Sequence, residues 1–163
     1  AAALRNPGTL KGLVLSAPAL AAREAVPPLK ALAVRLLSRF APNTGALTLP
    51  ATAISRDPAV VRAYESDPLV FRGAIPARTL VELLDVMAGF ADAAPKLRLP
   101  VLVQHGTADR LVPLAATRPV YERLGNAKLR TVRLCEGLFH EAYNEPEREQ
   151  VLADLEAWNG ARH

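Results

Sequence analysis

Two residues able to carry acid–base chemistry follow the ends of apolar segments. Asp109 comes after the run "PVLVQH" at 100–105, and His140 comes after "LRTVRLC" at 129–135. A carboxylate that accepts a hydrogen bond from one imidazole nitrogen fixes the tautomer and leaves the other nitrogen free to act as a base. Such a pair would take a proton from a nucleophile and return it to a leaving group.

Each residue also has an ordinary structural interpretation. An Asp that follows a strand often caps the next turn or helix, and a His in a loop is often only a surface residue. The two remain a candidate pair because of where they lie in the predicted fold.

Three segments have the composition of buried strands: 12–17, 100–105 and 129–135. The first two are nearly continuous apolar runs, which is typical of parallel strands covered on both faces. The third alternates more, which favours a position near a sheet edge. In an open parallel sheet, chemistry gathers at the carboxyl ends of the strands. We therefore expect Asp109 and His140 to meet there.

Helical patterns occupy the segments between and after these strands. They cover 27–40, 58–66 and 78–90. A final helix is expected to have Asn144 as its N-cap residue and to end at Gly160. In the segment 27–40, Leu29, Leu32, Leu36 and Phe40 share one face. The region 19–97 shows no convincing strand and is predicted to be a helical cap inserted after the first strand. The predicted fold class is α/β, in one domain.

Composition excludes several kinds of function. The net charge of +4 comes from scattered basic residues and aromatics are only 5% of the chain, so nucleic-acid binding is not expected. Cys135 is the only cysteine and the three histidines are far apart, so neither a metal nor a cofactor is expected. His105 and Gly106 are expected to serve the turn after their strand.

The sequence also predicts no transmembrane segment, because no apolar run approaches the roughly 20 residues that a membrane helix needs. No targeting signal is recognised at the start of the chain. The expected location is therefore cytoplasmic or peripherally membrane-associated.

Two segments resemble the acid and histidine segments of α/β-hydrolases. They are "VLVQHGTADRLVP" at 101–113 and "LCEGLFHEAYNEPEREQVLADLEAW" at 134–158. The resemblance is to the monoacylglycerol lipase and lysophospholipase-like group, which overlaps the serine aminopeptidase-like hydrolases. The stretch "ISRDPAVVRAYESDPLVFRG" at 54–73 is similar to the cap of bacterial monoacylglycerol lipases.

This resemblance implies roles for three residues. Asp109 would be the acid and His140 the base of a Ser-Asp-His triad, in the chain order that this fold uses. Tyr64 would lie near the polar head of the substrate, although a Tyr flanked by Val60 and Val61 could equally pack within the cap.

The expected nucleophile is absent from the sequence. The family serine lies in G-x-S-x-G on a strand-to-helix turn, and no such motif occurs here. None of the serines is a credible substitute: Ser16, Ser38, Ser55 and Ser66. The resemblance implies that 1–18 is the end of the nucleophile helix with the first core strand. It makes 19–97 the cap and 98–163 the C-terminal core that carries the acid and the histidine.

The chain is thus expected to be the C-terminal part of an α/β-hydrolase, with three parallel strands and flanking helices. The expected activity of the whole enzyme is hydrolysis of a small acyl ester, such as a monoacylglycerol or a lysophospholipid, and the chain alone is expected to be inactive. Its expected partner is the missing N-terminal half of the same fold. Two alternatives stay open: a non-catalytic remnant that acts only by association, and a relative of dehalogenases or epoxide hydrolases with a different nucleophile.

Overall fold

The computed structural model describes residues 10–20 and 27–161. The segment 1–9, which the sequence assigns to the end of a helix, lies outside the described residues, as does His163.

Three parallel strands form the central sheet. They are β1 (Leu13–Ser16), β4 (Val101–Gly106) and β5 (Arg130–Cys135), in the order β1-β4-β5. Every residue of the central strand β4 is buried, as its nearly continuous apolar run predicts, and this includes the polar Gln104 and His105. Strand β5 is only partly buried. The predicted parallel sheet, with its third strand at an edge, is therefore confirmed.

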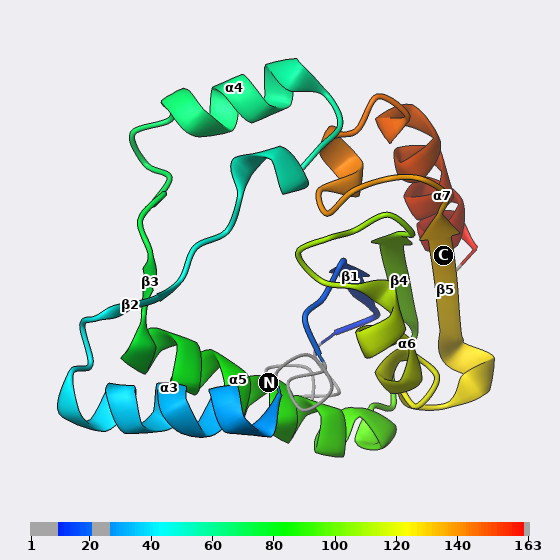
Figure 1. The fold of residues 1–163 in the computed structure, drawn as a ribbon. Coiled ribbons are helices and arrows are strands. Elements are labelled where there is room, and N and C mark those ends of the chain that lie inside the picture. The colour runs from blue at the N-terminus through cyan, green and yellow to red at the C-terminus, as the bar shows by residue number, and fades with distance from the viewer. Residues whose placement is uncertain (1–9, 21–26, 162–163) are drawn as a thin grey trace.

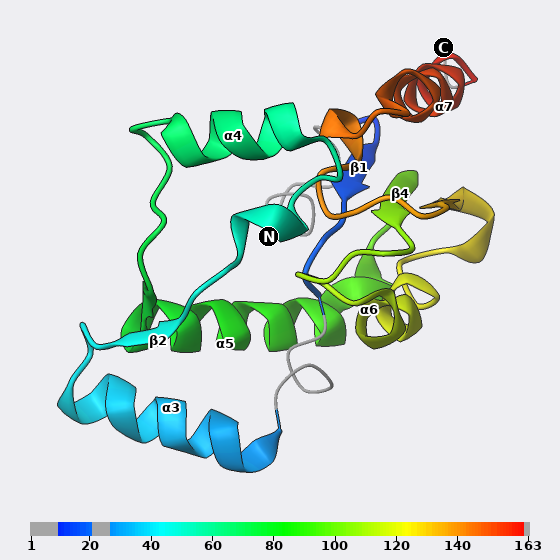
Figure 2. The same cartoon turned by 45° about the horizontal axis from the view of Figure 1, so that its top comes forward.

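Helices cover the two faces of this sheet. Helix α6 (Leu114–Tyr121) follows β4 and helix α7 (Arg148–Gly160) follows β5, and Figure 2 shows them on opposite sides of the strands. The main core lies where Val101 and Val103 of β4 meet Val120, Tyr121 and Leu124 of the α6 region. This part of the chain, from β4 to α7, also contains two 3-10 turns, η3 (Ala127–Leu129) and η4 (Ala142–Asn144).

The segment that the sequence predicts to be a cap, and that is called the cap below, is the chain between β1 and β4. Helices α3 (Pro28–Phe40) and α5 (Ala77–Ala93) lie side by side, and α4 (Pro58–Ser66) lies across from them (Figure 1). Short 3-10 turns η1 (Ala51–Ala53) and η2 (Ala94–Lys96) join these helices to the core. Asp57 caps α4 by accepting a hydrogen bond from Ala59 N at 2.7 Å, and Pro58 begins the helix.

The cap also contains two strands that the sequence did not predict. Strands β2 (Gly45–Leu47) and β3 (Ile75–Pro76) pair in antiparallel fashion and tie the two sides of the cap together. They are too short to show an alternating pattern, and the Gly, Ala and Pro residues beside Leu47 and Ile75 weaken any strand signal. The prediction of a strand-free cap was therefore wrong.

The residue predicted to cap the N-terminus of the last helix, Asn144, was also wrong. Helix α7 begins at Arg148, and Asn144 instead ends the η4 turn, where its Nδ2 donates to Glu141 at 2.8 Å. Pro146 follows a buried Glu145, so the chain makes a turn there before the helix can start. The predicted end at Gly160 is confirmed.

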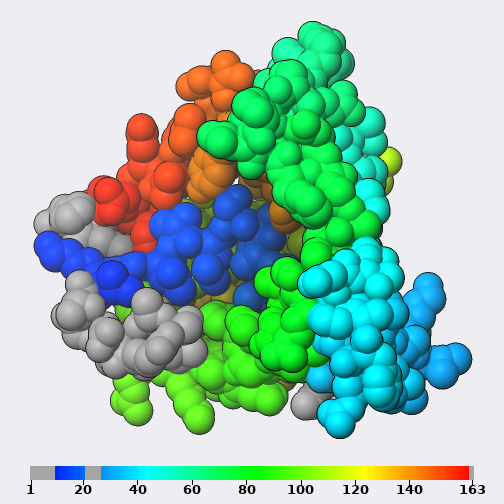
Figure 3. Space-filling model, turned by 90° about the vertical axis from the view of Figure 1, so that its left-hand side faces the viewer, coloured from blue at the N-terminus to red at the C-terminus, as the bar shows by residue number. Residues whose placement is uncertain are grey.

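The free edge of β1 lies at the surface of the molecule. Its other edge pairs with β4, and no described strand lies beyond it. Figure 3 shows the atoms of β1 in blue on this face, and Val14 is 39% exposed. An unpaired edge of this kind is a ready template for further strands.

Candidate active site

Asp109 and His140 meet at the carboxyl end of the sheet. Asp109 lies in the loop after β4 and His140 in the loop after β5, and these strands are neighbours. The imidazole Nδ1 donates to Asp109 Oδ2 at 2.8 Å. The structure thus brings together the carboxylate and the imidazole that the sequence paired.

Asp109 is held by its own loop. It is 5% exposed, and its Oδ1 accepts hydrogen bonds from Leu111 N at 2.8 Å and Val112 N at 2.9 Å. Burial alone would raise the pKa of the Asp109 carboxyl. Hydrogen bonds from His105, His140 and the Val112 backbone outweigh burial and hold that pKa well below its usual range. The side chain is therefore an anion at neutral pH.

His140 is oriented as a base would need to be. The hydrogen bond to Asp109 raises the pKa of the His140 imidazole above its usual value, against the opposing effect of burial. Since Nδ1 is used by Asp109, the tautomer leaves Nε2 to receive a proton. Nε2 has no hydrogen-bond partner among the described residues, and the side chain is 29% exposed.

The loop at 136–141, which carries His140 and is called the histidine loop, lies close to the end of β4. Thr107 N donates to Cys135 O at 3.0 Å, Ala108 N to Leu138 O at 3.0 Å, and Gly137 N to Thr107 Oγ1 at 2.8 Å. His105 and Gly106 are the last residues of β4 rather than the turn that we expected. A Cβ on Gly106 would lie 2.2 Å from Leu138 O, so this glycine is what lets the histidine loop approach.

Replacing Gly106 with Ala is expected to lower the free energy of unfolding by about 1–3 kcal/mol, because the new methyl group collides with backbone that cannot move independently of the loop. Gly89 in α5 is the matched control, since a Cβ there meets nothing within 4 Å. Gly89→Ala should leave stability unchanged or raise it by up to about 1 kcal/mol. Chemical denaturation of both variants measures the difference, and equal effects would contradict the close-approach argument.

A segment of the cap is fastened to the histidine loop. Glu141 N, next to the histidine, donates to Ile54 O at 2.8 Å. Ser55 Oγ donates to Asn144 O at 3.0 Å. On the other side, the Arg110 guanidinium donates to Thr52 O at 2.7 Å. The cap residues 52–55 therefore contact both loops that carry Asp109 and His140.

A buried carboxylate, Glu145, completes this attachment. Its side chain is 0% exposed and accepts from Arg56 N at 2.8 Å, Arg56 Nε at 2.6 Å and Phe139 N at 3.4 Å. Phe139 directly precedes His140. Both peptide neighbours of the histidine are thus linked to the cap, one directly and one through Glu145. Glu145 was not predicted from the sequence, in which its place between Asn144 and Pro146 is its one local distinguishing feature.

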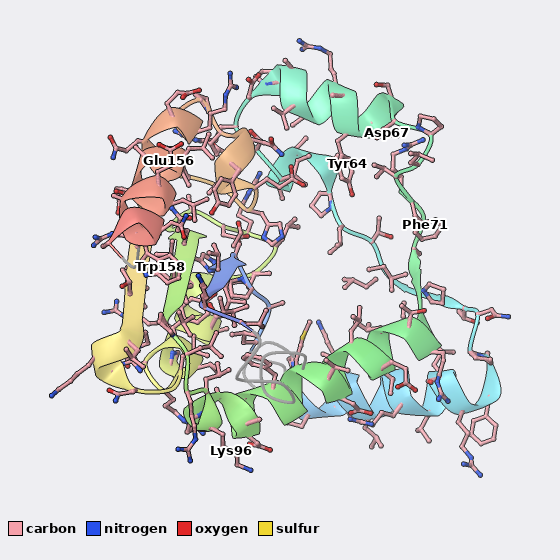
Figure 4. The ribbon with its side chains drawn as sticks, turned by 180° about the vertical axis from the view of Figure 1, so that it is seen from behind. Tyr64, Asp67, Phe71, Lys96, Glu156 and Trp158 are labelled. Carbon is pink, nitrogen blue, oxygen red and sulfur yellow. The ribbon has the colours of Figure 1, made fainter. Side chains whose placement is uncertain are left out.

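The remaining predicted residue, Tyr64, lies apart from the pair. It is half-buried on α4, and its side chain points toward the space between α4 and α5 (Figure 4). No hydrogen bond joins it to Asp109 or His140 within the described structure. Among the described residues none of the serines forms a hydrogen bond with His140 either, and Ser55 is hydrogen-bonded to Asn144 O and Asp57 N.

A cavity of about 740 Å³ separates the cap from the core next to this site. Its walls come from α5, from the chain around β2 and from the loop and helix that follow Asp109; they include Leu80, Leu84, Met87, Leu111 and Val112. The apolar face of α3 does not contribute. Leu29 and Phe40 of that face are each 78% exposed, so the predicted stripe on α3 points outward.

Metal and membrane-spanning features are not found in the described part of the chain. No group of three His, Cys, Asp or Glu side chains within 10–20 and 27–161 could hold a metal ion. None of the helices in these ranges is both long and apolar enough to span a bilayer.

Comparison with known proteins identifies the family. The family model described as serine aminopeptidase, S33, matches residues 1–147. The chain belongs to this family of α/β-hydrolases. The described sheet and helices are accordingly part of an α/β-hydrolase fold.

Individual relatives of this chain carry lipase names. Monoacylglycerol lipase of Mycolicibacterium smegmatis is 38% identical over 94% of this chain and 55% of its own length. Human monoglyceride lipase is 31% identical over 98% of this chain and 54% of its own. The crystal structure of the Paleococcus ferrophilus monoacylglycerol lipase superposes with a TM-score of 0.83 at 29% identity, covering 99% of this chain and 63% of that one. This S33 chain therefore spans about half the length of the curated relatives that it matches.

Proposed function

We propose that this chain supplies the acid, Asp109, and the base, His140, of a serine-dependent carboxylic-ester hydrolase. The observation that carries the proposal is the 2.8 Å hydrogen bond from His140 Nδ1 to an ionised, buried Asp109. The nucleophilic serine belongs to residues outside these 163, since the chain contains no G-x-S-x-G motif.

In this reaction His140 Nε2 accepts the proton of the serine hydroxyl as its oxygen attacks the ester carbonyl. The ester C–O bond breaks, the alcohol leaves with the proton returned by His140, and the acyl group stays on the serine. Water then attacks the acyl-enzyme in the same way and releases the fatty acid. Asp109 stabilises the imidazolium that forms in both steps and does not itself become protonated.

The cavity beside the site supports an acyl ester as substrate. Its walls are largely aliphatic and it begins at the loop that carries Asp109, so a hydrocarbon chain fits there better than a charged group. A monoacylglycerol or a lysophospholipid combines such a chain with a polar head. Tyr64 on α4 is proposed to lie near that head, because its side chain points toward the space between α4 and α5 (Figure 4).

The proposed division of the chain follows from this role. Residues 1–18 bring the first strand, 19–97 form the cap over the cavity, and 98–163 carry the acid and the base. The proposed partner is the N-terminal half of the same fold. It would add its strands at the free edge of β1, where Val14 is now exposed.

Ester hydrolysis measured with and without the nucleophile tests the proposal. The 163-residue chain alone is expected to show no turnover of a p-nitrophenyl ester or a monoacylglycerol. The protein extended at its N-terminus through a G-x-S-x-G segment is expected to hydrolyse both and to lose activity on His140→Ala. Turnover by the chain alone that His140→Ala abolishes would contradict the proposed inactivity. An active extended protein that tolerates His140→Ala would remove the histidine from the mechanism.

A further inference from the structure

A second histidine, His105, lies against the same carboxylate. It is 0% exposed in β4, and its Nε2 is hydrogen-bonded to Val112 O at 2.9 Å. The same Nε2 also lies 3.2 Å from Asp109 Oδ2, which is a close electrostatic contact. Its Nδ1 lies 2.6 Å from the hydroxyl of Tyr121, which is also within 3.1 Å of Pro18 O. The role expected from the sequence, a turn at the end of the strand, does not explain why the His105 imidazole is buried with a partner at each nitrogen.

The partners of His105 decide where its hydrogens are. A backbone carbonyl and an ionised carboxylate can only accept, so Nε2 must carry a hydrogen. Burial raises the pKa of the Tyr121 hydroxyl, so the phenol keeps its own proton. In neutral His105, Nδ1 accepts from Tyr121. In protonated His105, Nδ1 donates to Tyr121, which can then donate to Pro18 O.

Both oxygens of Asp109 therefore lie close to N–H groups. Oδ1 accepts from the backbone of Leu111 and Val112. Oδ2 faces the imidazoles of His140 and His105, at 2.8 and 3.2 Å. The two histidines thus share one oxygen, and the carboxylate cannot rotate without losing several of these contacts at once.

We propose that His105 is a positioning residue for the acid–base pair, which holds Oδ2 of Asp109 toward His140 and withdraws part of its negative charge. This inference rests on the proposed function, because it assumes that Asp109 serves His140. His105 acts through Asp109 and does not reach the substrate.

The charge that His105 withdraws has a measurable consequence. The charged or titratable groups that face His140 are Asp109 and Glu141, and those that face His105 are Asp109, Tyr121 and Cys135. Without the N–H of His105, Oδ2 interacts with His140 alone and stabilises its imidazolium more strongly. The neutral, active form of His140 then appears only at higher pH.

The first test uses the unaltered chain. Nuclear magnetic resonance of the histidine side-chain nitrogens is expected to show His105 Nε2 protonated throughout the pH range in which His140 titrates. An unprotonated Nε2 in this range would overturn the proposal, since such a nitrogen would present no hydrogen to the Asp109 carboxylate.

The second test compares two replacements. In His105→Leu, which removes the donor, the titration midpoint of His140 is expected to rise by roughly half a pH unit or more. In His105→Gln, whose amide N–H can replace Nε2–H, the midpoint should return toward that of the unaltered chain. In the extended, active protein the Leu variant should lower kcat with little change in KM. An unchanged midpoint in folded His105→Leu would overturn the proposal.

These tests are separable from the proposed function. If Asp109→Asn leaves ester hydrolysis intact in the extended protein, the triad assignment fails whatever His105 does. If Asp109→Asn abolishes hydrolysis but His105→Leu moves neither the midpoint nor kcat, the triad stands and the role of His105 fails.

Discussion

Asp109→Asn is expected to lower kcat by about 10⁴-fold in the protein that carries the nucleophile, with KM nearly unchanged. The buried carboxylate accepts from His140 Nδ1 at 2.8 Å and is held in place by two backbone N–H groups. A neutral amide cannot stabilise the imidazolium that forms during proton transfer. If the amide nitrogen introduced by Asp109→Asn donated to His140 Nδ1, the neutral imidazole would carry its hydrogen on Nε2 and could not act as a base there.

Asp57→Asn is the matched control for this loss of charge. Asp57 caps α4 from the surface, and Asn is as good a cap as Asp, so activity should stay within about two-fold and the fold should be intact. Steady-state kinetics with a p-nitrophenyl ester, with circular dichroism of both variants, measures the difference. Near-normal turnover by Asp109→Asn would remove Asp109 from the mechanism.

The sheet could be predicted from sequence because its strands are buried on both faces. A strand buried on both faces requires a nearly continuous apolar run, and the run at 100–105 has the length and composition of such a strand. The parallel order then places the loops after β4 and β5 at one edge, so the meeting of Asp109 and His140 follows from topology.

The cap was predicted less completely because its helices do not all face the core. The stripe on α3 has the periodicity of a buried face, yet Leu32 and Leu36 are more than half exposed. Periodicity shows that one face is apolar and does not show what covers it. The β2–β3 pair depends on contacts between distant segments that leave no local pattern.

The parts of the site that sequence reasoning missed are buried polar residues. His105 and Glu145 are each 0% exposed, although His is only intermediate in its tendency to be buried and Glu is almost never fully buried unless paired. Their burial is offset by partners far along the chain, Tyr121 for one and Arg56 for the other. No spacing rule could pair them, because the fold alone brings those partners together.

Arg56→Leu is expected to lower the free energy of unfolding by about 3 kcal/mol, because it leaves the buried carboxylate of Glu145 without its cation. The remaining donors to Glu145 would be two backbone N–H groups. The other ion pair of Arg56, with Glu147, lies at the surface and should contribute little. Because Glu145 also holds Phe139, we expect His140 to become more mobile, which amide hydrogen exchange at 139–141 would detect.

A second replacement and a surface control separate this burial effect from simple loss of an arginine. Adding Glu145→Gln to Arg56→Leu removes the uncompensated charge and keeps an acceptor for the backbone, so part of the lost stability should return. Arg118→Leu breaks an ion pair with Glu122 whose side chains are 61% and 64% exposed, and should cost less than about 0.5 kcal/mol. Chemical denaturation of the four proteins measures these differences. A double variant less stable than Arg56→Leu alone would show that Glu145 acts through shape and not through its charge.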